Sequence, residues 1–379
     1  MKIVSIEPTP SPNSMKINLD TELPQGHNVN YKSTDSLVDA PEYVSQLFAI
    51  KGVKGIYHVL DFIALERNPK VAWENILPLV HEVLGFKEEL ENQSENLDHS
   101  VPTEDAFGEV KVWIQMFRGI PMQVKLQDGE EEFRFGLPDM FKEAAMKASP
   151  ASSNLVMERQ WVEQTPRYGS VDEIGNEVVE EIQASFDRER LEHLVKIAFQ
   201  EENIKEESRQ EVTIEMFNDP DWKVRYAALD RIQPTFANID ILNKALEDSK
   251  ASIRRLATAY LGMIEEPEVL PYVYKALKDS SVAVRRTAGD CISDLGFKEA
   301  MPEMIESLND SSKLVRWRAA MYLYEVGDEG AIPALRKALN DSEFEVRMQV
   351  KMALSRIEGG EEAKGSVWHQ MTQARKQTN

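Results

Sequence analysis

Apolar residues recur with a period of about 31 residues along the C-terminal part of the chain. Five similar segments each contain an Asp, and an Arg follows six positions later. Counted from that Asp, apolar or small side chains occupy positions +5, +9 and +13, and those at +5 are Val224, Ile253, Val284, Val315 and Val346. Steps of four place side chains on one face of a helix. A second apolar stretch precedes each Asp, so each repeat is predicted as a helix, an Asp-containing turn and a second helix, which is typical of an α-solenoid.

The repeat strings resemble a known class. Asp279-Ser280-Ser281, followed by Val284-Arg285 and Ala288, is similar to HEAT repeats of the short type found in phycobilisome lyase-like proteins. The resemblance implies a HEAT-like solenoid of about five repeats over residues 200–358, followed by a tail over 359–379. It implies little about chemistry.

The repeated Asp and Arg are interpreted as structural. An Asp in the turn is suited to capping the next helix, and an Arg in every repeat is suited to linking neighbouring turns. A pair that recurs five times maintains stacking and does not perform one reaction. The predicted ladder consists of Asp219, Arg225, Asp248, Arg254, Asp279, Arg285, Asp310, Arg316, Asp341 and Arg347.

The opposite face of the second helices differs from repeat to repeat. At 100° per residue, positions +7, +11 and +14 lie opposite the core positions. Trp, Met and Arg are enriched in protein interfaces, so we expect a protein-binding groove here. The alternative is that another domain of the chain, or the tail with Trp368, covers this face. The candidate residues are Tyr226, Arg255, Arg286, Trp317, Met321, Tyr324, Met348 and Met352.

Residues 1–86 are predicted to form a small α+β domain. Strand-like runs at 3–6 and 15–19 are followed by a helix over 41–49, a strand over 62–65 and a helix over 71–84. The loop at residues 9–14 is rich in Pro, Ser and Asn, which indicates either a rigid turn or a ligand site.

The strings at residues 7–16 and 47–56 of this domain resemble the N-terminal domain of Nfu/NifU-type iron–sulfur scaffold proteins. That family carries its cluster on a separate domain with a CxxC pair. This chain has a single cysteine, Cys291, which lies among the repeats. The resemblance therefore implies the fold and target recognition, not cluster carriage.

Residues 87–105 are polar and acidic and are interpreted as a linker. A second α+β domain, the middle domain, is predicted over 106–199, with strands at 110–117, 120–126, 132–135 and 155–162 and helices from 137 to 148 and over 177–198. The chain is thus predicted to hold two small α+β domains followed by an all-α HEAT-like solenoid.

The domain order resembles the conserved virulence factor C family of Firmicutes. In that family an Nfu-type domain, a virulence factor domain and HEAT-like repeats follow one another. The middle domain adds the strings at 135–138 and 167–169. The resemblance implies a link to the regulation of virulence-factor expression, without a molecular mechanism.

Composition and motif content exclude several classes of partner and catalytic site. The 44 basic and 65 acidic side chains give a net charge of −21, which disfavours nucleic acid and anionic membranes as partners. The chain contains no phosphate-binding Gly-rich loop, no GxSxG elbow and no HExxH pair, and its six histidines are scattered. No run of residues is apolar enough to span a membrane or to act as a signal peptide. We therefore expect a cytoplasmic protein that is not an enzyme and has no catalytic, cofactor or metal site.

Two functions follow. The first is a non-catalytic adaptor or scaffold that binds a protein partner on the solenoid face. The alternative is an accessory factor in iron–sulfur cluster assembly or delivery, which recognises carrier or client proteins through the Nfu-like domain. In that case the cluster is transient or borne by the partner.

Overall fold

The helical repeats are divided between two units of the structure, each of which also contains an α+β domain. The computed structural model describes residues 1–379 except 10, 25–26, 86–107, 130, 201–211 and 361–379, so the predicted linker and most of the tail lie outside the described residues. Unit 1 is Met1–Gly108 with Gly296–Asn379, and unit 2 is Glu109–Leu295.

Unit 1 begins with a five-stranded antiparallel sheet of order β1-β2-β5-β4-β3. Alternate residues of the central strands point into the core, including Ile17, Ile63 and Leu65, where they form one cluster with Trp73 and other helical residues. The elements are β1 (Ile3–Pro8), β2 (Ser14–Leu19), β3 (Asn28–Lys32), α1 (Glu42–Phe48), β4 (Val53–Val59), β5 (Phe62–Arg67) and α2 (Trp73–Leu84).

The last two repeats also belong to unit 1. Repeat 4 contains α13 (Met301–Ser307) and α14 (Lys313–Val326), and repeat 5 contains α15 (Ile332–Ala338) and α16 (Phe344–Glu358). Phe344 is a buried member of the same core cluster as the N-terminal sheet. The N-terminal domain and the final repeat therefore share one core.

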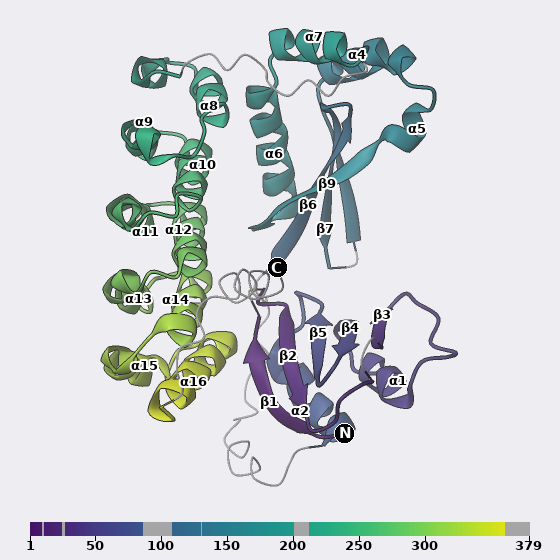
Figure 1. The fold of residues 1–379 in the computed structure, drawn as a ribbon, viewed down its shortest axis with the longest axis vertical. Coiled ribbons are helices and arrows are strands. Elements are labelled where there is room, and N and C mark those ends of the chain that lie inside the picture. Colours follow the sequence, from purple (N-terminus) through teal and green to yellow (C-terminus); the bar gives the residue numbers. More distant parts are fainter. Residues whose placement is uncertain (10, 25–26, 86–107, 130, 201–211, 361–379) are drawn as a thin grey trace. The chain divides into compact units, whose positions relative to one another are not determined.

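Unit 2 begins with a four-stranded antiparallel sheet of order β8-β7-β6-β9, in which Figure 1 labels β6, β7 and β9. One face of the sheet carries Val112, Val124 and Leu126, which form a core cluster with Phe141 and Ile174 from the helices. The elements are β6 (Glu109–Phe117), β7 (Ile120–Asp128), β8 (Glu131–Gly136), α4 (Asp139–Ala148), α5 (Leu155–Glu158), β9 (Gln160–Tyr168), α6 (Val171–Ser185) and α7 (Arg188–Ile197).

Three repeats complete unit 2. In repeat 1 the described part before the ladder turn is a short 3₁₀ helix, η3 (Ile214–Asn218), and the second helix is α8 (Trp222–Asp230). Repeat 2 contains α9 (Ile239–Ala245) and α10 (Ala251–Leu261), and repeat 3 contains α11 (Leu270–Leu277) and α12 (Val282–Leu295). Second helices pack on one another, α8 on α10 and α10 on α12, as stacking of repeats requires. The fold class predicted from the sequence is confirmed.

Two predicted elements of the middle domain are wrong in detail. The strand expected at 155–162 is a helical turn, α5, followed by a strand that begins only at Gln160. The Asn154 side chain accepts a hydrogen bond from the Met157 amide and so starts that turn. The helical stretch expected over 177–198 is helical but begins earlier, at Val171, and is divided into α6 and α7, because Asp187 caps a new helix start by accepting from the Arg190 amide.

Candidate interaction surfaces

The predicted binding face of repeats 1 to 3 is occupied by the middle domain of the same chain. Tyr226 on α8 is only 5% exposed, and α8 packs against α6. Arg255 on α10 contacts Glu181 of α6, and Arg286 on α12 contacts Tyr168 of β9. The structure therefore supports the alternative left open by the sequence, in which another domain of the chain covers this face.

Glu181 is the centre of this contact. Its Oε2 atom accepts a hydrogen bond from Arg167 Nη2 at 2.7 Å, and its Oε1 atom accepts one from Arg255 Nη2 at 2.8 Å. Arg167 lies on β9 and Arg255 on a repeat helix, so one carboxylate joins strand, helix and solenoid. We call Arg167, Glu181 and Arg255 the carboxylate clamp.

The clamp keeps Glu181 ionised although it is buried. Burial would raise the pKa of this carboxyl, but attraction and hydrogen bonds from Arg255 and Arg167 outweigh burial and hold the pKa below its usual range. A buried charge is tolerated only when it is paired in this way. Removal of Arg167 or Arg255 would leave the buried Glu181 carboxylate with less opposite charge beside it and would therefore destabilise the interface.

Tyr168 makes a second contact beside the clamp. Its hydroxyl donates to Glu109 Oε2 at 2.7 Å and accepts from Arg286 Nη2 at 2.9 Å. The Arg286 guanidinium lies 3.7 Å from the centroid of the Tyr168 ring, a cation–π geometry. Arg286 also pairs with Asp290 one turn along α12, at 3.3 Å. Burial raises the pKa of Tyr168 far above its usual range, so the hydroxyl stays protonated at neutral pH.

The predicted face in repeats 4 and 5 is also largely inaccessible. Trp317 and Met321 on α14 are 4% and 1% exposed, and Met348 on α16 packs against the core cluster of the N-terminal domain. Tyr324 and Met352 are partly buried. The tail residue Trp368, which the sequence offered as another cover, lies outside the described residues.

The Pro-rich loop of the N-terminal domain is a structural turn in its described part. Trp73 Nε1 donates to the Pro12 carbonyl at 2.8 Å, and Arg67 Nε donates to Asn13 Oδ1 at 3.2 Å. Arg67 also donates through Nη1 to Glu345 Oε1 on α16 at 2.8 Å, with both side chains almost fully buried. One arginine thus holds the loop and pairs with the final repeat.

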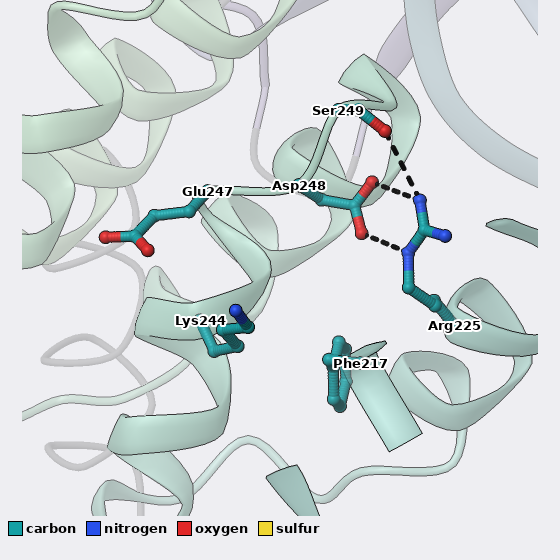
Figure 2. Close-up of a pocket in the computed structure, with 6 residues that line it drawn as sticks. All are labelled: Phe217, Arg225, Lys244, Glu247, Asp248 and Ser249. Carbon is teal, nitrogen blue, oxygen red and sulfur yellow. Dashed lines mark hydrogen bonds and ion pairs between the residues drawn. The ribbon is translucent and has the colours of Figure 1, made fainter. Parts of the chain in front are cut away.

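The repeated Asp and Arg form fork-shaped pairs between consecutive turns. Figure 2 shows the first, in which Arg225 Nε and Nη2 donate to the two carboxylate oxygens of Asp248 at 2.6 and 2.8 Å. Arg254 binds Asp279 in the same way, and so does Arg316 with Asp341.

Each of these aspartates also accepts from the amide two residues later, which shapes the turn before the second helix. The bonds run from Lys250, Ser281 and Glu343 to their respective Asp residues at 2.7–2.9 Å. Phe217, Lys244, Glu247 and Ser249 complete a hollow of about 210 Å³ around the first pair (Figure 2). The charges at its centre, those of Arg225 and Asp248, already neutralise each other. We therefore interpret the hollow as part of the packing between two repeats and not as a ligand site.

Cys291 is not placed for metal or redox chemistry. It is 7% exposed, and a methyl group on Gly262 would lie 2.4 Å from its Sγ atom, which shows how closely the two segments pack there. Burial raises the pKa of this thiol well above its usual range, and Sγ donates to the Thr258 carbonyl at 3.4 Å. Reactive thiols have lowered pKa values and are accessible.

The histidines in the described part of the chain do not gather into a metal site. Burial lowers the pKa of His81 to about 4, and among the described residues no three His, Cys, Asp or Glu side chains are grouped as metal ligands. Also within the described part of the chain, no helix is long and apolar enough to cross a membrane.

The outward face of the middle-domain sheet carries two tryptophans and two cations. Neighbouring strands place Trp113 opposite Lys125, and Lys125 opposite Arg134. The ammonium group of Lys125 lies 4.5 Å from the Trp113 ring and 4.8 Å from the Trp161 ring, and the Arg134 guanidinium lies 5.7 Å from the Trp161 ring. We call these four residues the outer sheet face. Its Arg134 side chain is 54% exposed.

The outer sheet face, Glu181 and Arg67 are not among the residues predicted from the sequence. Their signals in the sequence are individually weak. Arg67 follows Ile63 and Leu65 at the inward positions of a strand, and Glu181 lies beside buried Val178 and Ile182 on α6. A charged residue at a core position is informative, because it requires a buried partner.

Glu181 generates a pH-dependent prediction. Because its folded pKa is lowered, its contribution to stability is complete above the unfolded pKa of about 4.3 and is lost as pH falls through the folded value. We expect Glu181→Gln to lower the stability of unit 2 by on the order of 3 kcal/mol at neutral pH. In urea unfolding, the difference between wild type and variant shrinks below about pH 4.

The matched control is Glu180→Gln. Glu180 is half exposed and pairs with Lys250 at 3.0 Å, and such surface pairs contribute at most about 1 kcal/mol. An equal loss in both variants, or a Glu181→Gln effect that grows as the solution is acidified, would contradict the role of the clamp.

Three known protein families each match a different part of the chain. Family models match residues 4–91 (scaffold protein Nfu/NifU N terminal), 115–195 (virulence factor) and, for HEAT repeats, 210–293, 273–355 and 301–371. Among solved structures, protein SAV1430 of Staphylococcus aureus is 36% identical, with a TM-score of 0.21, over 22% of this chain and 98% of its own.

Two relatives extend over nearly the full length. The uncharacterized protein YpgR of Bacillus subtilis (strain 168) is 57% identical, and the match covers 99% of both chains. The conserved virulence factor C of Staphylococcus haemolyticus (strain JCSC1435) is 47% identical over 99% of this chain and 100% of its own. The family resemblance inferred from the sequence is confirmed: the chain belongs to the conserved virulence factor C family.

Proposed function

We propose that this protein is a non-catalytic adaptor whose HEAT-like repeats position two α+β domains for binding to other proteins. The observation that carries the proposal is the carboxylate clamp. The solenoid residues best suited to bind a partner instead bind the middle domain, through Glu181 and Tyr168. The repeats then serve as a frame, and recognition passes to surfaces of the domains that they hold.

The outer sheet face is the recognition surface that fits this role in unit 2. Tryptophan and arginine dominate the energetics of protein interfaces because they combine a large contact area with hydrogen-bonding groups. Trp113, Trp161 and Arg134 supply these groups on a sheet whose opposite face is already filled by its own helices. The Lys125 ammonium group lies within cation–π distance of both rings.

The link to virulence rests on the family. Relatives in staphylococci are named conserved virulence factor C. We propose that the partners of this adaptor belong to the machinery that regulates virulence-factor expression, with the adaptor acting by binding.

Substitution of the outer sheet face tests the adaptor role. The double variant Trp113→Ala/Trp161→Ala is expected to lose most proteins that wild type captures from a lysate of its own organism, as measured by quantitative mass spectrometry. Met263→Ala is the control, because Met263 is also exposed in unit 2 but follows the C-terminal end of α10. Unchanged circular dichroism establishes that the fold survives. Equal capture by both variants would refute this surface as the recognition site.

A second candidate is an accessory role in iron–sulfur cluster assembly or delivery. The match of residues 4–91 to the Nfu/NifU N-terminal model favours it. The chain's one thiol is buried in unit 2, so the domain would act by recognising carriers or clients. After anaerobic reconstitution with iron and sulfide, we expect no stable visible absorbance from the protein alone. A stable cluster spectrum would show instead that the chain carries a cluster itself.

A further inference from the structure

The arginines of the ladder bind carboxylates with one recurring geometry. In Arg225, Arg254 and Arg316, Nη1 donates to the carbonyl of the Asp in the same repeat, at 2.6–2.9 Å. That bond orients the guanidinium so that Nε and Nη2 bind the Asp of the next repeat. The same arrangement occurs in both units, so it is a property of the repeat.

The last arginine of the ladder has the same orientation but no carboxylate. Arg347 Nη1 donates to the Asp341 and Ser342 carbonyls, both at 2.8 Å. Among the described residues, no Asp or Glu contacts its Nε or Nη2 atoms. In the same repeat Leu339, two residues before Asp341, is partly exposed, whereas the leucines at the same position of repeats 2 to 4 are 5–6% exposed. Repeat 5 thus ends with an oriented, unfilled fork.

The first aspartate of the ladder has the opposite vacancy. Asp219 Oδ1 accepts from the Asp221 amide at 2.8 Å, as in the other turns, yet within the described part of the chain no guanidinium contacts its carboxylate. Val224 is 47% exposed, whereas the four residues at its position in later repeats are at most 2% exposed. Ile214 and Met216 on η3 are 40% and 36% exposed.

Terminal repeats of a solenoid normally present a polar outer surface that ends the stack. Repeat 1 presents apolar side chains and a ladder carboxylate without its arginine instead. The group that belongs there is known from the other repeats. It is an arginine fork on the second helix of a preceding repeat, with apolar residues beside it.

We propose that the repeats of two copies of this chain stack head to tail, with Arg347 of one copy binding Asp219 of the other. The junction would reproduce the pair that Arg225 forms with Asp248, and Leu339 would bring apolar surface toward Val224. Such a contact is heterologous, because different surfaces of the two copies meet, so longer chains of molecules can form. This goes beyond the adaptor function and does not depend on it.

The net charge of the chain determines the ionic strength at which two copies can associate. A charge of −21 on each copy opposes association at long range, and physiological salt screens it with a Debye length of about 8 Å. The fork and carboxylate would be in direct contact and are screened much less. We therefore expect association at physiological ionic strength and less of it at low salt.

Complementation between two variants tests the proposal. Asp219→Asn keeps the oxygen that shapes the turn but removes the carboxylate charge, and Arg347→Lys keeps the charge but removes the fork. In sedimentation velocity from micromolar to near-millimolar concentration, wild type is expected to associate. Each variant alone should associate at least about tenfold more weakly, as loss of a charge-assisted bond implies. An equal mixture should form dimers that grow no further, since one intact junction remains.

Two control variants test the specificity of the junction. Arg336→Ala and Asp240→Asn alter exposed charges at repeats 5 and 2 outside the ladder, and both should associate like wild type. Wild type that stays monomeric throughout would overturn the proposal. So would association that survives in both ladder variants, or a mixture of the two that does not associate.

Discussion

A buried carboxylate shared by two arginines determines how the middle domain is attached to the repeats. Glu181 could not be buried alone, because the cost of removing a charge from water is several kcal/mol. Arg167 makes the charge tolerable from within the domain, and Arg255 makes it tolerable from the repeats. This orientation of the domain on the repeats is favoured, because any other would remove Arg255 and leave only Arg167 to compensate the buried charge.

Unit 1 uses the same physical device with the charges exchanged. There the arginine, Arg67, lies on a strand of the α+β domain, and the carboxylate, Glu345, lies on the helix of a repeat. Arg67 is also 5.1 Å from the Trp73 ring and holds the Pro-rich loop. In each unit a polar contact is surrounded by apolar packing, and a repeat helix becomes part of the domain's support. The repeats are thus internal scaffolding as well as a stack.

Much of this architecture could be predicted from the sequence, because it depends on short-range periodicity. The 31-residue spacing of Asp and Arg predicts the repeats, and the domain order predicts the family. The accessibility of the groove could not be predicted. Tyr226 and Trp317 are residue types typical of protein interfaces, and the sequence alone does not show whether other parts of the same chain cover them. The elements of the middle domain that were predicted wrongly are those in which a helix-capping side chain interrupts the apolar pattern. Asn154 and Asp187 cap helices inside segments whose apolar pattern indicates a continuous strand or helix.

Attachment of the middle domain to the repeats depends on the carboxylate clamp, and a double-mutant cycle between Glu181 and Arg255 tests this dependence most directly. Free energies of unfolding of unit 2 would be measured for wild type, Glu181→Gln, Arg255→Met and the double variant. Residues in direct contact couple by about 0.5–3 kcal/mol, and for this buried pair we predict the upper part of that range. The double variant should then be little worse than either single one. Additive losses, with a coupling energy near zero, would contradict the account.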